Sequence, residues 1–238
     1  MADPFPLTRH SAIEAGRSPD ERTRRLGYER VARAYWRPVL AYLRLRHRLA
    51  RADAEDVTQQ ILERLWDRQL LAEFRPERAR FRTFLRTCID HLVANRSRDA
   101  AAAKRGGGWQ PLAKDISELE QLLDGEAAPI AEDAEALFER EFTRTVFEEA
   151  MRALQEDYAA RGRSLDLEIF EQYELENRDE WSHQDLAVRH GLTTSAVTNR
   201  LASVRRDLRL RVLATLESLT ATEEEFRAEA ERILGRRP

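Results

Sequence analysis

Residues 183–206, HQDLAVRHGLTTSAVTNRLASVRR, contain the pattern on which the fold prediction rests. Ala187 is small, as the close crossing of two helices requires, and Gly191 can take a positive φ in a tight turn because it lacks a Cβ. Val197 and Leu201 lie four residues apart, so they share one face of the following helix and turn toward a core. The spacing predicts a helix-turn-helix.

The second helix of this motif has the polar residues that reading DNA requires. Thr193 or Thr194 can cap it, which leaves its first turns exposed where such helices contact base edges in the major groove. A plain helical hairpin with a solvated basic face has the same pattern, so both interpretations stay open at this point. The candidate DNA-reading residues are Thr194, Ser195, Thr198, Asn199, Arg200 and Arg205.

Composition favours an all-α protein and excludes several classes. Only 9 Gly and 8 Pro occur in 238 residues, which argues against a turn-rich β protein. One cysteine and five scattered histidines offer no metal-site spacing, so we expect no metal and no cofactor. No nucleophile motif, paired carboxylates or phosphate loop is present, and a non-enzyme is predicted. Because no signal peptide or membrane-spanning stretch is evident, we expect a cytoplasmic protein without membrane contact.

The net charge of −3 conceals a strong segregation of charge. Residues 109–180 contain 21 acidic and 7 basic residues, whereas residues 76–108 and 181–216 are basic. Screening by salt limits the electrostatic effect of a charged patch to about 10 Å, so the local balance of charge matters more than the net charge of the chain. A near-neutral chain is therefore compatible with nucleic-acid binding.

The first half of the chain predicts a small helical bundle. A periodic segment runs from residue 28 to 49, where Pro38 predicts a kink or the meeting of two helices. Asp53 is expected to cap the next helix, DAEDVTQQILERLW, which has an apolar stripe on one face and acids and glutamines on the other. A third helix is expected in FRTFLRTCIDHLVANRSRD, residues 81–99. This set is the size of an independent domain.

These observations predict two small helical domains joined by an acidic flexible linker. The Gly106–Gly108 run breaks the chain between them. The expected divisions are a flexible tail at 1–21, a first domain at 22–105, the linker at 106–136 with a short helix near 116–123, a helix-turn-helix domain at 137–216 and a C-terminal helical extension at 217–238.

Taken together, the segments resemble a bacterial RNA polymerase sigma factor of the sigma-70 family, of the two-domain extracytoplasmic-function (ECF) type. Residues 28–105, with DAEDVTQQILERLW and FRTFLRTCIDHLVANRSRD, are similar to sigma region 2, and residues 181–216 are similar to region 4. The resemblance implies promoter-specific initiation, with core RNA polymerase and promoter DNA as partners and an anti-sigma factor as a possible regulator. The linker would thread through the active-site cleft and RNA exit channel of the polymerase.

The resemblance also implies roles for individual residues. The polar face of residues 53–66 would dock on the clamp helices of the largest polymerase subunit, while the flap region is the other implied contact. The helix-turn-helix candidates would face the −35 element. The implied polymerase-binding residues are Asp56, Gln59, Gln60 and Glu63, and the implied −10 residues are Arg75, Arg78, Arg80, Arg82, Arg96, Arg98 and Arg105.

Some positions depart from the family pattern. Phe84 stands where a Trp is usual and Asp90 where an Asn is usual, while Thr198 and Ser203 replace basic residues of the recognition helix, which predicts fewer phosphate contacts there. The alternative function is a stand-alone helix-turn-helix DNA-binding regulator or a sigma-like interaction module. The acidic face at residues 53–66 could equally be a solvated helix face.

Overall fold

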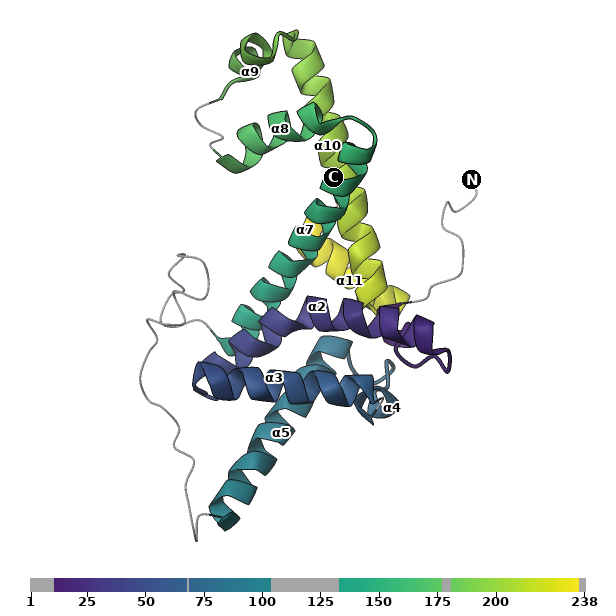
Figure 1. Cartoon of the computed structure of the whole chain (residues 1–238), viewed down its shortest axis with the longest axis vertical. Helices are drawn as coiled ribbons and strands as arrows, with labels where there is room; N and C mark the ends of the chain where they lie inside the picture. Colours follow the sequence, from purple (N-terminus) through teal and green to yellow (C-terminus); the bar gives the residue numbers. More distant parts are fainter. Residues whose placement is uncertain (1–10, 68, 104–132, 177–180, 236–238) are drawn as a thin grey trace. The chain divides into compact units, whose positions relative to one another are not determined.

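All regular elements in the described part of the chain are helices, as predicted (Figure 1). The computed structural model describes residues 11–67, 69–103, 133–176 and 181–235. These residues form two units. The first unit contains the described residues up to Thr145 together with Glu217–Gly235, and the second contains Val146–Leu216. Two long helices, α7 and α10, therefore each contribute residues to both units, and each unit is described separately below.

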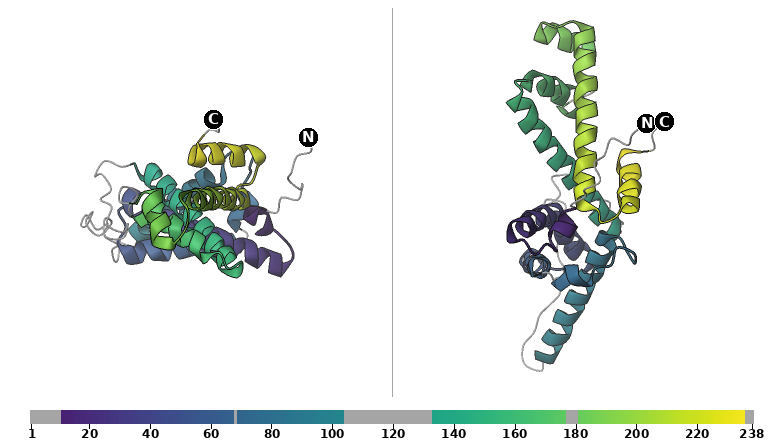
Figure 2. Two further views of the ribbon diagram at one scale, coloured as in Figure 1. Left: turned by 90° about the horizontal axis from the view of Figure 1, so that it is seen from above. Right: turned by 90° about the vertical axis from the view of Figure 1, so that its right-hand side faces the viewer.

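The first unit is formed around α2. Its helices pack in a bundle in which α2 and α3 lie side by side (Figure 1). After α10 the chain reverses direction into α11 (Figure 2). The helices are α1 (Ala12–Ala15), α2 (Glu21–Arg46), α3 (Arg51–Trp66), α4 (Gln69–Glu73), α5 (Phe81–Ala103), the beginning of α7 (Ala134–Ala160), the end of α10 (Thr194–Leu219) and α11 (Glu223–Leu234).

Helix α2 runs through Pro38 without a break. Asp20 caps it by accepting a hydrogen bond from the Thr23 N–H at 2.8 Å. A proline inside a helix removes one hydrogen bond and costs about 3 kcal/mol. Burial of the surrounding face, including Tyr35 and Val39, offsets that cost. Of the two predicted outcomes, the meeting of two separate helices is wrong.

Two further local expectations need correction. Helix α3 begins at Arg51 and has Ala50 as its N-cap, without a side-chain cap. The prediction that Asp53 caps it is therefore wrong. Asp53 lies in the first turn, where its negative charge interacts favourably with the positive end of the helix dipole. Part of the tail expected at residues 1–21 forms helix α1, whose Ile13 is buried, and Arg17 donates to the carbonyl oxygens of Leu71 and Phe74.

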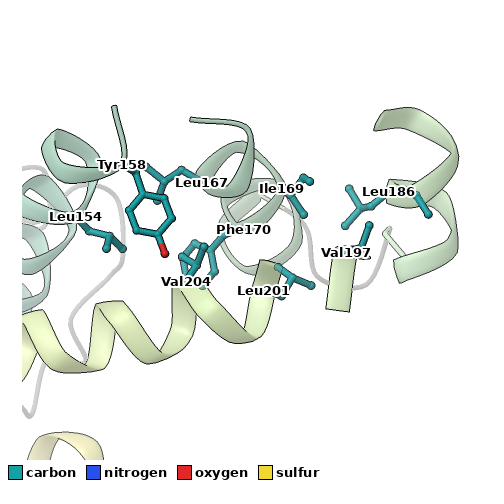
Figure 3. Close-up of a cluster of buried hydrophobic side chains, with 10 residues drawn as sticks. Leu154, Tyr158, Leu167, Ile169, Phe170, Leu186, Val197, Leu201 and Val204 are labelled. Atoms are coloured by element: carbon teal, nitrogen blue, oxygen red, sulfur yellow. The ribbon is translucent and has the colours of Figure 1, made fainter. Parts of the chain in front are cut away.

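The second unit has its own apolar core (Figure 3). It contains the rest of α7, α8 (Ser164–Glu171), the π-helical turn η1 (Gln172–Glu176), α9 (His183–His190) and most of α10. Gly162, with φ +68°, separates α7 from α8 as predicted. The fully buried side chains of this core come from every one of these α-helices: Leu154, Tyr158, Ile169, Leu186, Val197, Leu201 and Val204.

Residues 104–132 lie outside the described residues, and with them the glycine run and the short helix predicted near residues 116–123. The observed units differ from the predicted division at residue 137, because the beginning of α7 and all of α11 group with the first unit. Within the described residues, no helix has the length and apolar character needed to span a membrane.

Candidate functional site

The polar face of α3 is exposed as the sequence predicts. Asp56, Gln59 and Glu63 are exposed and Gln60 is half-buried, whereas the opposite face of the helix, including Val57 and Ile61, is buried. The Gln59 Nε2 donates to Glu63 Oε1 at 3.0 Å. Because the face is acidic and polar and the helix is held by its apolar side, it offers a rigid surface to a basic partner.

The arginines predicted to contact DNA have different environments. Arg75 and Arg78 are exposed in the loop before α5, and Arg80, at the end of that loop, is also exposed. Arg82 is only 4 % exposed, and Arg96 is half-buried. The side chain of Arg98 and the whole of Arg105 lie outside the described part of the chain.

Arg82 is enclosed by acids from two distant helices. It donates to Glu229 of α11 through a short contact, and its Nη2 lies 3.1 Å from Glu139 Oε2 of α7. Its guanidinium also stacks over the ring of Phe142 at 4.4 Å. Burial works to lower the pKa of Arg82, but the neighbouring negative groups outweigh it and raise the pKa, so the side chain stays charged.

The same acidic side chains reach the neighbouring arginines. Arg80 Nη1 lies 3.2 Å from Glu229, and Arg86 Nη1 lies 2.9 Å from Glu139. Sequence reasoning missed Glu139, Glu225 and Glu229 because they lie 53 to 149 positions from the groups they bind. The one available signal was the amphipathic pattern of residues 222–234, which predicted a C-terminal helix, either a regulatory latch over the helix-turn-helix domain or a frayed tail.

Helix α9, the turn at Gly191 and the start of α10 have clear local caps. Ser182 and Asp185 cap α9 reciprocally, and Gly191 ends it in the left-handed region with φ +64°. Thr193 caps α10, because its Oγ1 accepts a hydrogen bond from the Ala196 N–H at 3.2 Å. Leu186 and Ala187 are buried, and so are Val197 and Leu201, as predicted for those two.

The predicted DNA-reading residues of α10 divide into two sets. Thr194, Ser195, Thr198 and Asn199 are exposed. Arg200 is instead paired through a short contact with Asp166 of α8, a residue that is only 2 % exposed. Arg205 is paired with Glu174 of η1. Both arginines are engaged within the unit, and the hydroxyls of Thr194, Ser195 and Thr198 also form hydrogen bonds there, with Gln184, Thr193 and His183.

Asp90 also has an internal role in the first unit. It accepts hydrogen bonds from the Tyr42 hydroxyl at 3.2 Å and lies 2.7 Å from His47 Nε2. Burial, followed by the charge of Asp90, raises the pKa of Tyr42 to about 12. In the described residues no group of three or more His, Cys, Asp or Glu side chains could hold a metal ion.

The described residues thus provide a polar face on α3, a basic loop before α5, and two helices, α9 and α10, joined by a tight turn at Gly191. Residues 31–103 match the family model described as Sigma-70 region 2. The match includes α3 and the basic loop before α5, but not α9 and α10. No curated protein and no solved structure matches the chain.

Proposed function

We propose that the chain is a two-domain sigma factor of the extracytoplasmic-function type, which binds core RNA polymerase and directs initiation at specific promoters. The match of residues 31–103 to sigma-70 region 2 is the observation that carries this proposal. The exposed face of α3, with Asp56, Gln59, Gln60 and Glu63, docks on the basic clamp helices of the largest subunit. Charge complementarity of this kind steers and orients the encounter.

The promoter contacts follow from the exposed basic and polar side chains. Arg75, Arg78 and Arg80 contact the −10 element, while the exposed side chains at the start of α10 face the −35 element. Separating the strands needs no catalytic group, because binding the unpaired bases and phosphates offsets the few kcal/mol that each unstacked base costs. With Arg200 and Arg205 engaged internally, the helix-turn-helix alone binds duplex DNA weakly.

The decisive experiment is binding of the full chain to purified core polymerase, followed by transcription from a promoter library. Asp56→Arg reverses the charge in the centre of the α3 face and is expected to abolish binding without unfolding the chain. Glu29→Arg is the matched control, because Glu29 is also exposed but lies on α2. It is expected to bind as the wild type does.

Two results would contradict the proposal. The first is a wild-type chain that never associates with core polymerase. The second is specific, tight duplex binding without polymerase, which favours a stand-alone helix-turn-helix regulator instead. Equal binding by Asp56→Arg and the wild type would remove the α3 face from the polymerase interface.

A further inference from the structure

Helix α11 is unusual because its most buried side chains are acids. Glu225 is 6 % exposed and Glu229 is 1 % exposed, and no apolar side chain of α11 is buried to that extent. Phe226, Ala230 and Ile233 are only partly buried. A helix that docks by the hydrophobic effect shows the opposite arrangement, with apolar residues inward and charges outward. The most buried contacts of α11 are therefore made by charged rather than apolar side chains.

The two buried carboxylates bind one end of α5. Glu225 Oε1 accepts a hydrogen bond at 3.1 Å from the N–H of Phe81, the first residue of α5. Glu229 accepts from Arg80 at 3.2 Å and also from Arg82. A helix N-terminus with converging guanidinium groups is an arrangement that binds phosphate as readily as carboxylate.

Arg82 supplies a second, independent indication that this is an anion site. It is 4 % exposed, yet its Nε and Nη1 find no hydrogen-bond acceptor in the described part of the chain. Buried guanidinium donors without a partner are costly. A phosphate, with more acceptor oxygens than a carboxylate, could satisfy donors that Glu229 leaves unused.

We propose that the N-terminal end of α5, formed by the Phe81 N–H, Arg80 and Arg82, is a nucleic-acid phosphate site, and that α11 occupies it as an internal competitor. The proposal rests on the proposed function, which places the neighbouring loop arginines on promoter DNA. In the closed form described here, Glu225 and Glu229 fill the site. When α11 leaves, the site becomes available to the sugar-phosphate backbone of a promoter strand.

The energetics allow such an exchange. The desolvation free energy that burying an ion pair costs is nearly as large as the attraction between its two charges. The ion pairs of Glu229 therefore contribute little net free energy to the docking of α11. The two acids differ: burial raises the pKa of Glu225, whereas at Glu229 the charges of Arg82 and Arg232 outweigh burial and lower the pKa. For a ligand that binds only the open form, the apparent affinity is the intrinsic affinity multiplied by the fraction of molecules that are open. Promoter DNA in a polymerase complex presents many phosphates and can displace one acidic helix.

The test uses full-length variants and a fluorescein-labelled single-stranded DNA oligonucleotide in an anisotropy titration at low salt. Glu225→Gln/Glu229→Gln removes both carboxylates that fill the site. Glu224→Gln/Glu231→Gln is the matched control, because it removes the same charge from exposed positions of the same helix. We expect the first variant to bind about tenfold more tightly than the wild type and the control, as for a site open in about one molecule in ten.

Two further chains make the result specific. A chain ending at Ala221 lacks α11 and is expected to show the same gain. Adding Arg80→Ala to the double variant is expected to reduce the gain, and Arg80 is exposed enough to be replaced without unfolding. Equal affinities in all variants overturn the proposal, as does a gain that survives Arg80→Ala. Loss of helical circular dichroism in both the double variant and the shortened chain also overturns it, because α11 is then part of the core.

Core polymerase binding by the wild type separates this inference from the proposed function. If the wild type binds polymerase but no variant gains affinity for DNA, the competitor role of α11 fails alone. If the variants gain affinity but the wild type never binds polymerase, the proposed function fails and the anion site remains.

Discussion

At the scale of single residues, Cys88 shows how packing sets reactivity. It is the chain's one cysteine and lies half-buried on α5. Burial, followed by the charge of Glu73, raises the pKa of its thiol to about 11. The thiolate is the reactive form, and its population at neutral pH falls as the pKa rises.

We predict that Cys88 in the folded chain reacts with iodoacetamide at pH 8 about a hundredfold more slowly than the same cysteine in concentrated urea, because an unperturbed thiol has a pKa of about 8.5. The native rate should rise steadily between about pH 8 and pH 10, whereas the unfolded rate levels off. Mass spectrometry of the alkylated protein measures both. Equal rates at pH 8 would show that the thiol is not shielded.

The arginines show what can be predicted for a residue from sequence and what cannot. The sequence treated Arg75, Arg78, Arg80 and Arg82 alike as −10 candidates, and the structure has the first three exposed. The sequence could not distinguish Arg80 from Arg82, two positions apart, because exposure depends on Glu139 and Glu229. Those partners are distant in the sequence, and no local periodicity encodes such a pairing.

At the scale of elements, α8 is joined to α10 through one carboxylate. Asp166 is 2 % exposed and binds both Arg163, at 2.7 Å, and Arg200 of α10. Local rules predicted the turn at Gly191 and a cap at Thr193 or Thr194, because caps and turns depend on adjacent residues. The role of α8 was not predictable, since Asp166 and Arg200 are 34 residues apart.

We predict that Asp166→Asn destabilises the second unit by about 1–2 kcal/mol. Removing one partner of a buried ion pair costs about 3–5 kcal/mol, but Arg163 and Arg200 are about a third exposed and solvent screens part of that loss. Hydrogen exchange of the α8 amides should therefore accelerate about fivefold to thirtyfold. Glu168→Gln, an exposed change on the same helix, is the control and should leave exchange unchanged. Unchanged exchange in Asp166→Asn would mean that α8 is held by its apolar side chains alone.

At the scale of the whole molecule, the first unit is assembled from segments far apart in the chain. Tyr35 of α2 is 1 % exposed and stacks on Phe142 of α7, with ring centroids 5.3 Å apart. Leu137 and Phe138 of the same helix are fully buried. Composition and charge predicted a boundary after residue 105, because a linker is recognised by its polarity. They could not show that the helix after the linker returns to the first bundle.

This assembly predicts that a fragment of residues 1–105 is less stable than a fragment of residues 1–145. The shorter fragment exposes Tyr35 and loses the apolar side chains of α7 that cover it, and each such side chain contributes about 1.5–3 kcal/mol when fully buried. Urea unfolding followed by circular dichroism should give a lower midpoint for the shorter fragment, which should also bind an apolar dye such as ANS more strongly. Both fragments lack residues 217–235, so the comparison isolates α7. Equal midpoints would show that residues 22–105 form a complete domain, as the sequence alone predicted.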